Sequence, residues 1–150
     1  MTAQLWVILG EDNARKGSTI RALTGAGKKR ELNIALSGGE IVKILIAVMS
    51  VNEPAKAPDP ASWAKQTNKR GGNHLVAFRT GSGRFENARA PEKYLKKFLE
   101  GGGVIKLLVN IGGKAPNWVQ GLGCTYNEVT ERDLPSNAIA HRIRRFWKWL

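Results

Sequence analysis

The sequence predicts a three-layer α/β fold, with a mostly parallel sheet between helices and one β-hairpin near the sheet edge. Three observations support this prediction. Apolar runs typical of buried strands alternate with segments of helical periodicity along the chain. Glycine or proline stands at most boundaries between these segments. No change in composition divides the chain, so we expect residues 1–150 to form a single α/β domain.

Each predicted element is recognised by its pattern and its boundaries. The strands are short apolar runs, whereas the helices begin or end at proline and glycine. A tight turn at Ser37-Gly38-Gly39 joins two of the strands into the hairpin. In chain order we expect a strand at 3–9, a helix at 18–23, strands at 32–36 and 41–51, a helix at 60–68, a strand at 74–79, a helix from Pro91, a strand at 104–111 and a last helix after Pro135.

The last helix combines an apolar stripe with a basic face. The spacing of the stripe predicts a helix that packs on the sheet and turns its basic residues to water. A helix of this kind is also able to lie against a phosphate backbone or an anionic membrane. Trp149 is left unexplained by packing and is a candidate for partner contact, base stacking or edge burial. The stripe consists of Ile139, Ile143, Phe146, Trp147 and Leu150.

A strong positive charge indicates an anionic partner. The chain has 24 Lys and Arg against 12 Asp and Glu, a formal net charge of +12. Self-repulsion of this size is tolerated more readily when the working partner is phosphate, nucleic acid or an acidic protein surface. The alternative is a basic surface that only aids solubility.

Cysteine and histidine usage excludes several classes of site. Cys124 is the only cysteine, so no intramolecular disulfide forms, and two histidines with one cysteine do not make a closed zinc site. Neither histidine has a neighbouring serine or cysteine at a spacing that marks a nucleophilic triad.

The first residues lack a signal-peptide pattern, and no apolar run is long enough to span a bilayer. We therefore expect a cytoplasmic protein; its oligomeric state is left open.

The loop after the first strand carries the sharpest local signal. A loop that cradles phosphate needs a strand before it, flexible backbone, a lysine and a helix N-terminus directly after it. These four features follow one another in Leu9-Gly10-Glu11-Asp12-Asn13-Ala14-Arg15-Lys16-Gly17-Ser18-Thr19. Aligned on Lys16, the segment resembles a degenerate P-loop (Walker A loop) of the P-loop NTPase superfamily, whose pattern is Gly, four residues, Gly-Lys, then Ser or Thr.

Two positions depart from the superfamily pattern. Arg15 stands where the second glycine belongs, and Gly17 stands where the magnesium-binding hydroxyl belongs. Either the register slips so that Ser18 supplies the hydroxyl, or magnesium is not held. Catalysis also needs a carboxylate near a strand end, for which the sequence offers Glu53 and, inside the loop, Asp12. Whether the protein is an enzyme therefore stays open.

The resemblance implies a phosphate-bearing ligand, either ATP or GTP with magnesium or a nucleic-acid phosphate. Hydrolysis is a weaker extension of this prediction. The plain alternative is a strand-to-helix connection with no ligand. The expected binding residues are Gly10, Lys16, Gly17, Ser18 and Thr19.

Basic residues elsewhere are candidates for nucleic-acid or anion contact. If the strand at 74–79 runs parallel to the first, Arg79 or Arg84 reaches an anion held over the loop. The alternative function is a non-catalytic basic module that binds nucleic acid or an acidic protein, with a purely structural loop. The contact candidates are Arg15, Arg79, Arg84, Arg142 and Arg145.

Overall fold

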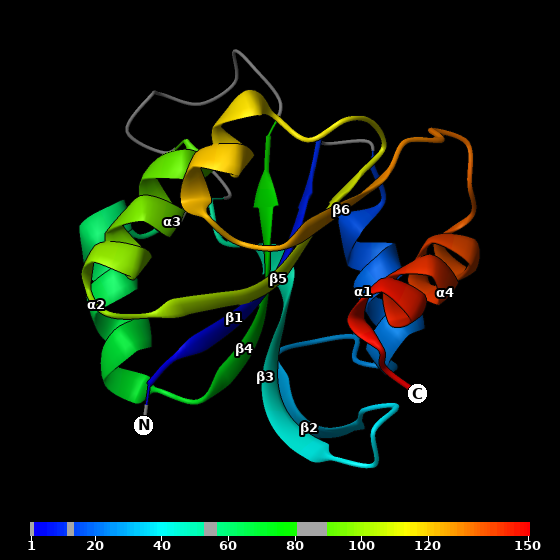
Figure 1. Ribbon diagram of the computed structural model, residues 1–150, viewed down its shortest axis with the longest axis horizontal. Helices are drawn as coiled ribbons and strands as arrows, with labels where there is room; N and C mark the ends of the chain where they lie inside the picture. Colours follow the sequence, from blue (N-terminus) through cyan, green and yellow to red (C-terminus); the bar gives the residue numbers. More distant parts are fainter. Residues whose placement is uncertain (1, 12–13, 53–56, 81–89) are drawn as a thin grey trace.

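The computed structural model describes residues 2–11, 14–52, 57–80 and 90–150. Within these ranges six strands form one sheet in the order β2-β3-β4-β1-β5-β6. Five of them run parallel, and β2 pairs antiparallel with β3 at one edge (Figure 1). The strands are β1 (Gln4–Gly10), β2 (Arg30–Ala35), β3 (Ile41–Ser50), β4 (Asn73–Arg79), β5 (Val104–Ile111) and β6 (Tyr126–Val129).

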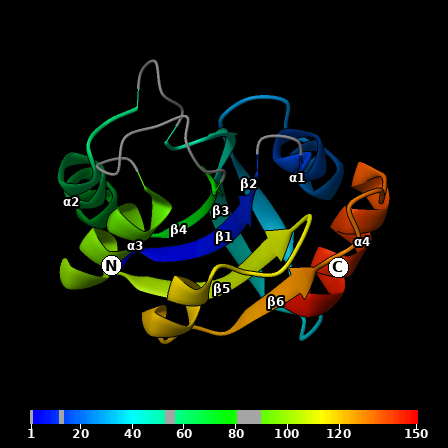
Figure 2. The same ribbon diagram turned by 90° about the horizontal axis from the view of Figure 1, so that it is seen from above.

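Helices cover both faces of the sheet. One face carries α1 and α4, and the other carries α2, α3 and the short 3₁₀ helix η2 (Figure 2). Asp59 caps α2 by accepting from the Ser62 amide at 2.9 Å, and Pro60 is its first residue, as the sequence predicts. The helices are α1 (Lys16–Thr24), α2 (Pro60–Arg70), α3 (Pro91–Glu100), η2 (Asn117–Leu122) and α4 (Ser136–Trp147).

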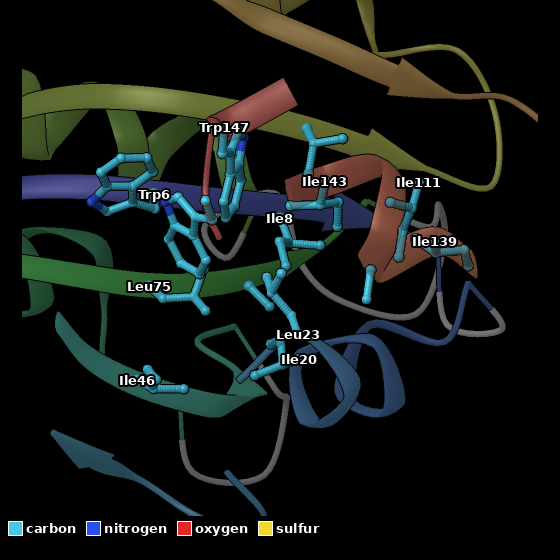
Figure 3. Packing of buried hydrophobic residues seen from close by; sticks show 14 of the residues in the cluster. Trp6, Ile8, Ile20, Leu23, Ile46, Leu75, Ile111, Ile139, Ile143 and Trp147 are labelled. Carbon is cyan, nitrogen blue, oxygen red and sulfur yellow. The ribbon is translucent and has the colours of Figure 1, made fainter. Parts of the chain in front are cut away.

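The central strand β1 contributes to both hydrophobic cores. Trp6 and Ile8 face α1 and α4, where they pack with Ile20 and Leu23 of α1 and with Ile139 and Ile143 of α4 (Figure 3). The alternate residues Leu5, Val7 and Leu9 face α2 and α3. Because period-two alternation sends successive side chains to opposite faces, a wholly apolar run is what a strand covered on both faces requires.

The predicted α/β class, mostly parallel sheet and edge hairpin are confirmed, but the start of α1 and the segment before α4 differ from the prediction. Helix α1 begins at Lys16 instead of residue 18. The segment 112–134, expected as a loop, contains η2 and the four-residue strand β6. These elements are short and partly exposed, so their sequence shows no sustained apolar period.

The C-terminal residues pack differently from the expected stripe. Helix α4 ends at Trp147, and Lys148 takes a left-handed conformation with φ 56° that turns the chain back toward β2. Trp149 then bridges to Leu36 and is buried, whereas Leu150 is 75% exposed. Of the three roles expected for Trp149, the structure therefore shows edge burial.

Helix α4 is linked to the C-terminal end of α1 by a half-buried charge. Arg144 donates from Nη2 to the carbonyl oxygens of Ala22 at 2.8 Å and Leu23 at 3.1 Å. A cation at this end offsets both the unpaired carbonyls and the helix dipole. Arg144 is therefore part of the packing of the two helices. In the described ranges, no helix has the length and apolar character needed to cross a membrane.

Replacing Arg144 is expected to destabilise the fold. Arg144→Gln removes a charge-assisted contact with two carbonyl groups, so the free energy of unfolding should fall by about 1–3 kcal/mol in urea titrations. Arg145→Gln makes the same charge change at an exposed neighbour and should alter stability by less than about 0.5 kcal/mol. Equal effects of the two substitutions would contradict the capping role.

Candidate functional site

The candidate site lies where the chain leaves the carboxyl ends of β1 and β4. The two strands pair in parallel, and Gly10 stands opposite Arg79 in their register. After β1 the chain enters α1 on one face of the sheet, and α3, which follows β4 in the chain, packs on the other face. Neighbouring parallel strands whose connections diverge in this way form the crevice where open α/β sheets bind ligands.

Lys16 fastens the loop to the end of β1. Its ammonium donates to the carbonyl oxygens of Gly10 and Glu11, both at 2.8 Å, and the residue is 6% exposed. The Gly10 carbonyl also accepts from the Thr80 amide at 3.1 Å, which links the loop to the residue that follows β4. A positive charge therefore lies between the ends of two strands and the start of α1.

Close packing at Gly10 leaves no room for a side chain. A Cβ atom there would lie 2.8 Å from Ala14 Cβ and 3.2 Å from the Ile111 carbonyl oxygen. Gly112, with φ +81°, lies against Ala14 from the end of β5, where an added Cβ would be 3.2 Å away. Glycine at position 10 is therefore required by the approach of the loop to β5.

Arg15 adopts a conformation that glycine normally supplies. Its φ of 66° and ψ of 34° are left-handed, and it is the N-cap residue of α1. The position is the one at which the P-loop pattern has its second glycine. Its guanidinium is directed away from the helix start, since Nη1 donates to the Leu134 carbonyl at 3.2 Å. The backbone at position 15 is thus turned as a glycine would allow, at a cost of about 1–2 kcal/mol.

The first turn of α1 presents amide groups without a side-chain cap. Among the described residues no side chain bonds to this helix start, and no acid lies in its first turn. The Thr19 amide donates to the Arg15 carbonyl at 2.9 Å, within the helix itself, and Thr19 stays a predicted binding residue. The first-turn amides are those of Lys16, Gly17 and Ser18.

The hydroxyl groups near the helix start differ in exposure. Ser18 is exposed, whereas Thr19 is 0% exposed and its Oγ1 has no hydrogen-bond partner in the described part of the chain. Of these two hydroxyls, only that of Ser18 is placed to meet a ligand from solvent.

The basic contact candidates do not gather at one place. Arg79 lies beside Gly10, and strand alternation puts its side chain on the α1 face with Ala77. The parallel pairing on which its candidacy depends is thus present. Arg142 forms an ion pair with Glu131. Arg145 lies far from the loop, because its neighbour Arg144 contacts the C-terminal end of α1 and Lys16 lies at the N-terminal end. Arg84 lies outside the described residues, as do the carboxylate candidates Glu53 and Asp12.

Two asparagines at the carboxyl ends of the parallel strands were not predicted as site residues. The Asn52 side chain, which is fully buried, accepts from the Arg79 amide at 2.8 Å and donates to the Arg79 carbonyl at 3.0 Å. Asn110, at the end of β5, donates to the carbonyls of Gly113 and Lys114. Its Oδ1 is buried with no partner in the described ranges. Both asparagines stand at or just after the end of an apolar run in the sequence. This position could have identified them, because polar residues at the carboxyl ends of parallel strands lie where open α/β sheets bind ligands.

The structure also places the groups able to bind a metal or react as a thiol. Over the ranges that the structure describes, no three His, Cys, Asp or Glu side chains are grouped to hold a metal ion. Burial raises the pKa of the Cys124 thiol, which disfavours the reactive thiolate.

Comparison with protein-family models, curated proteins and solved structures found no match to this chain. The likeness to a P-loop therefore rests on the loop residues themselves and stays a prediction.

The packing at Gly10 gives a direct test of the loop geometry. Gly10→Ala is expected to lower the free energy of unfolding by about 1–3 kcal/mol, because the added methyl group overlaps Ala14. Gly38→Ala is the matched control, since no atom lies within 4 Å of its Cβ position and its φ is not positive. Thermal or urea unfolding of both variants measures the difference. A Gly10→Ala protein as stable as the control would show that the loop is not packed in this way.

Proposed function

We propose that the turn from Gly10 to Thr19 binds a phosphate-bearing ligand, a nucleotide or the phosphate of a nucleic acid. The observation that carries this proposal is the start of α1 directly after the loop, where no described side chain caps the helix and the Lys16 ammonium lies close by. Amide groups and the dipole of a helix N-terminus favour an anion there. The location between β1 and β4 is also where a ligand is expected in an open α/β sheet.

Lys16 acts in this proposal by exchanging its partners. The Lys16 ammonium has three hydrogens to donate, and the carbonyls of Gly10 and Glu11 are among the groups that accept them. A phosphate oxygen is a stronger acceptor than a neutral carbonyl, because the bond is assisted by charge on both sides. The proposed binding step therefore moves the ammonium toward the ligand and loosens the loop from the end of β1.

We propose that this site binds its ligand, and we do not assign hydrolysis to it. Gly17 provides no hydroxyl at the magnesium position of the pattern, and Thr19 Oγ1 is fully buried. We therefore expect ATP or GTP to bind through its phosphates with little dependence on magnesium. Arg79, whose backbone is held by Asn52, is the proposed second cation of the site.

The alternative of a non-catalytic basic module rests on the net charge of +12. Two arginines of α4 have partners within the protein, since Arg144 caps α1 and Arg142 pairs with Glu131. These contacts reduce the charge that α4 offers to a nucleic acid. This alternative predicts binding that weakens steeply with salt and depends little on any single residue.

Isothermal titration with ATP and GTP, with and without magnesium, tests the proposal. We expect saturable binding that Lys16→Ala weakens at least about tenfold, because a charge-assisted contact contributes about 1.5–3 kcal/mol. Lys28→Ala, an exposed lysine beyond the far end of α1, removes the same charge and should leave the affinity unchanged.

Stability must be measured beside affinity, because Lys16 also fastens the loop. Urea titration of Lys16→Ala identifies the fraction that is folded under the binding conditions. A folded Lys16→Ala protein that binds ATP as the native chain does would overturn the proposal, and so would a native chain that binds neither nucleotide.

A further inference from the structure

A cavity on the other face of the sheet is lined by both apolar and basic residues. It has a volume of about 210 Å³ and lies between α2 and the strands β3 and β4. Trp63, Val51 and Val76 contribute to its apolar lining, and Lys29, Arg70 and His74 supply the basic groups. Leu45, Arg70 and His74 also line an adjoining cavity of about 430 Å³. A body larger than a single ion therefore has room beside these three basic residues.

Among the described residues, no acidic side chain pairs with the two cations of this cavity. Within the described part of the chain neither Lys29 nor Arg70 forms an ion pair. Glu31 lines the adjoining cavity, where it lies 3.9 Å from the ammonium of Lys43. Arg70 and His74, which are close in sequence, thus line one cavity with the distant Lys29, and no described acid pairs with either cation.

His74 is a buried polar residue of the cavity. It is 6% exposed, and its Nε2 lies 2.8 Å from the Gly71 carbonyl oxygen. A carbonyl only accepts, so Nε2 carries a hydrogen and Nδ1 is left for a ligand. Burial lowers the pKa of His74, and the charges of Arg70 and Lys29 lower it further, against the opposing effect of the Gly71 bond. The ring is therefore neutral at pH 7 while the cavity holds no anion.

We propose that this cavity binds a small organic oxyanion, whose charged group lies among Lys29, Arg70 and His74 and whose apolar part contacts Trp63 and the neighbouring valines. Arg70 provides a planar set of donors suited to an oxyanion, and Lys29 adds a second positive charge. This site is independent of the one proposed at α1, which lies on the other face of the sheet.

Binding at this cavity is coupled to proton uptake by His74. An anion stabilises the charged imidazolium, whose Nδ1–H then becomes a donor, so the pKa of His74 rises when the ligand binds. For a ligand that does not itself titrate, affinity is highest at low pH and falls as the pH rises between the free and bound pKa values. The other charged groups facing the histidine are Arg70 on α2, Lys29 before β2, Glu31 on β2 and Lys43 on β3.

Proton NMR of the two histidine rings tests this proposal with phenyl sulfate, an oxyanion that stays charged across the pH range used. We expect saturating phenyl sulfate to raise the pKa of His74, whose signal is assigned with His74→Gln. At a fixed pH, the ring signals of His141, on the exposed side of α4, should not move when phenyl sulfate is added. Phenyl sulfate should bind about tenfold more tightly than inorganic sulfate, because its ring contacts the apolar residues that line the cavity.

A charge-matched pair of variants identifies the residues responsible. Arg70→Gln should raise the pKa of His74 in the free protein, since a repelling charge is lost, yet weaken phenyl sulfate binding about tenfold or more. Lys65→Gln removes the same charge from an exposed position on α2 and should change neither quantity. Lys16→Ala should also leave this binding unchanged, which separates this test from the test of the α1 site.

Three results would overturn the proposal. The first is a His74 titration that phenyl sulfate does not shift, and the second is an equal shift of both histidines. The third is binding that survives Arg70→Gln as well as it survives Lys65→Gln. Equal affinities for phenyl sulfate and sulfate would remove the apolar contact from the proposal.

Discussion

The burial of β1 along both edges and both faces is the constraint on which the rest of the structure depends. All seven residues of β1 pair with β4, and six pair with β5. Its side chains supply both cores, so helices are required on each face of the sheet. The chain leaves this crowded strand through Gly10, where no side chain fits. The same crowding brings Lys16 and the start of α1 to the carboxyl end of β1, where the proposed ligand would bind.

Much of the fold was predictable because its signals are local. Continuous apolar runs mark strands covered on both faces, and the glycine turn at 37–39 marks the hairpin. The strand β6 was missed because four residues, only one of them fully buried, give no period to detect. Leu150 was assigned to the helical stripe since spacing alone does not show that Lys148 ends the helix in a left-handed conformation. Tertiary pairing with Leu36 decides that Trp149 is buried instead.

The candidate sites were predictable only where their residues are neighbours in sequence. Gly10 and Lys16 belong to one loop, and the loop pattern was sufficient to select them. The left-handed backbone of Arg15 and the use of the Thr19 amide inside α1 depend on where the helix begins, which is uncertain by a few residues from sequence. The basic cavity joins Lys29, Arg70 and His74, whose proximity follows from the strand order. In the sequence, each of these three residues looks like a common surface residue. The proposal of an anion site depends on their lying around one cavity.

The central claim, that the start of α1 binds phosphate, is tested most directly by amide NMR of ¹⁵N-labelled protein titrated with pyrophosphate. Pyrophosphate isolates the phosphate contact from any recognition of a base or sugar. The account predicts saturable shifts of the Gly17 and Ser18 amides, in the first turn of α1, which no described side chain caps. Shifts confined to exposed basic residues of α4, with the Gly17 and Ser18 amides unchanged, would contradict it.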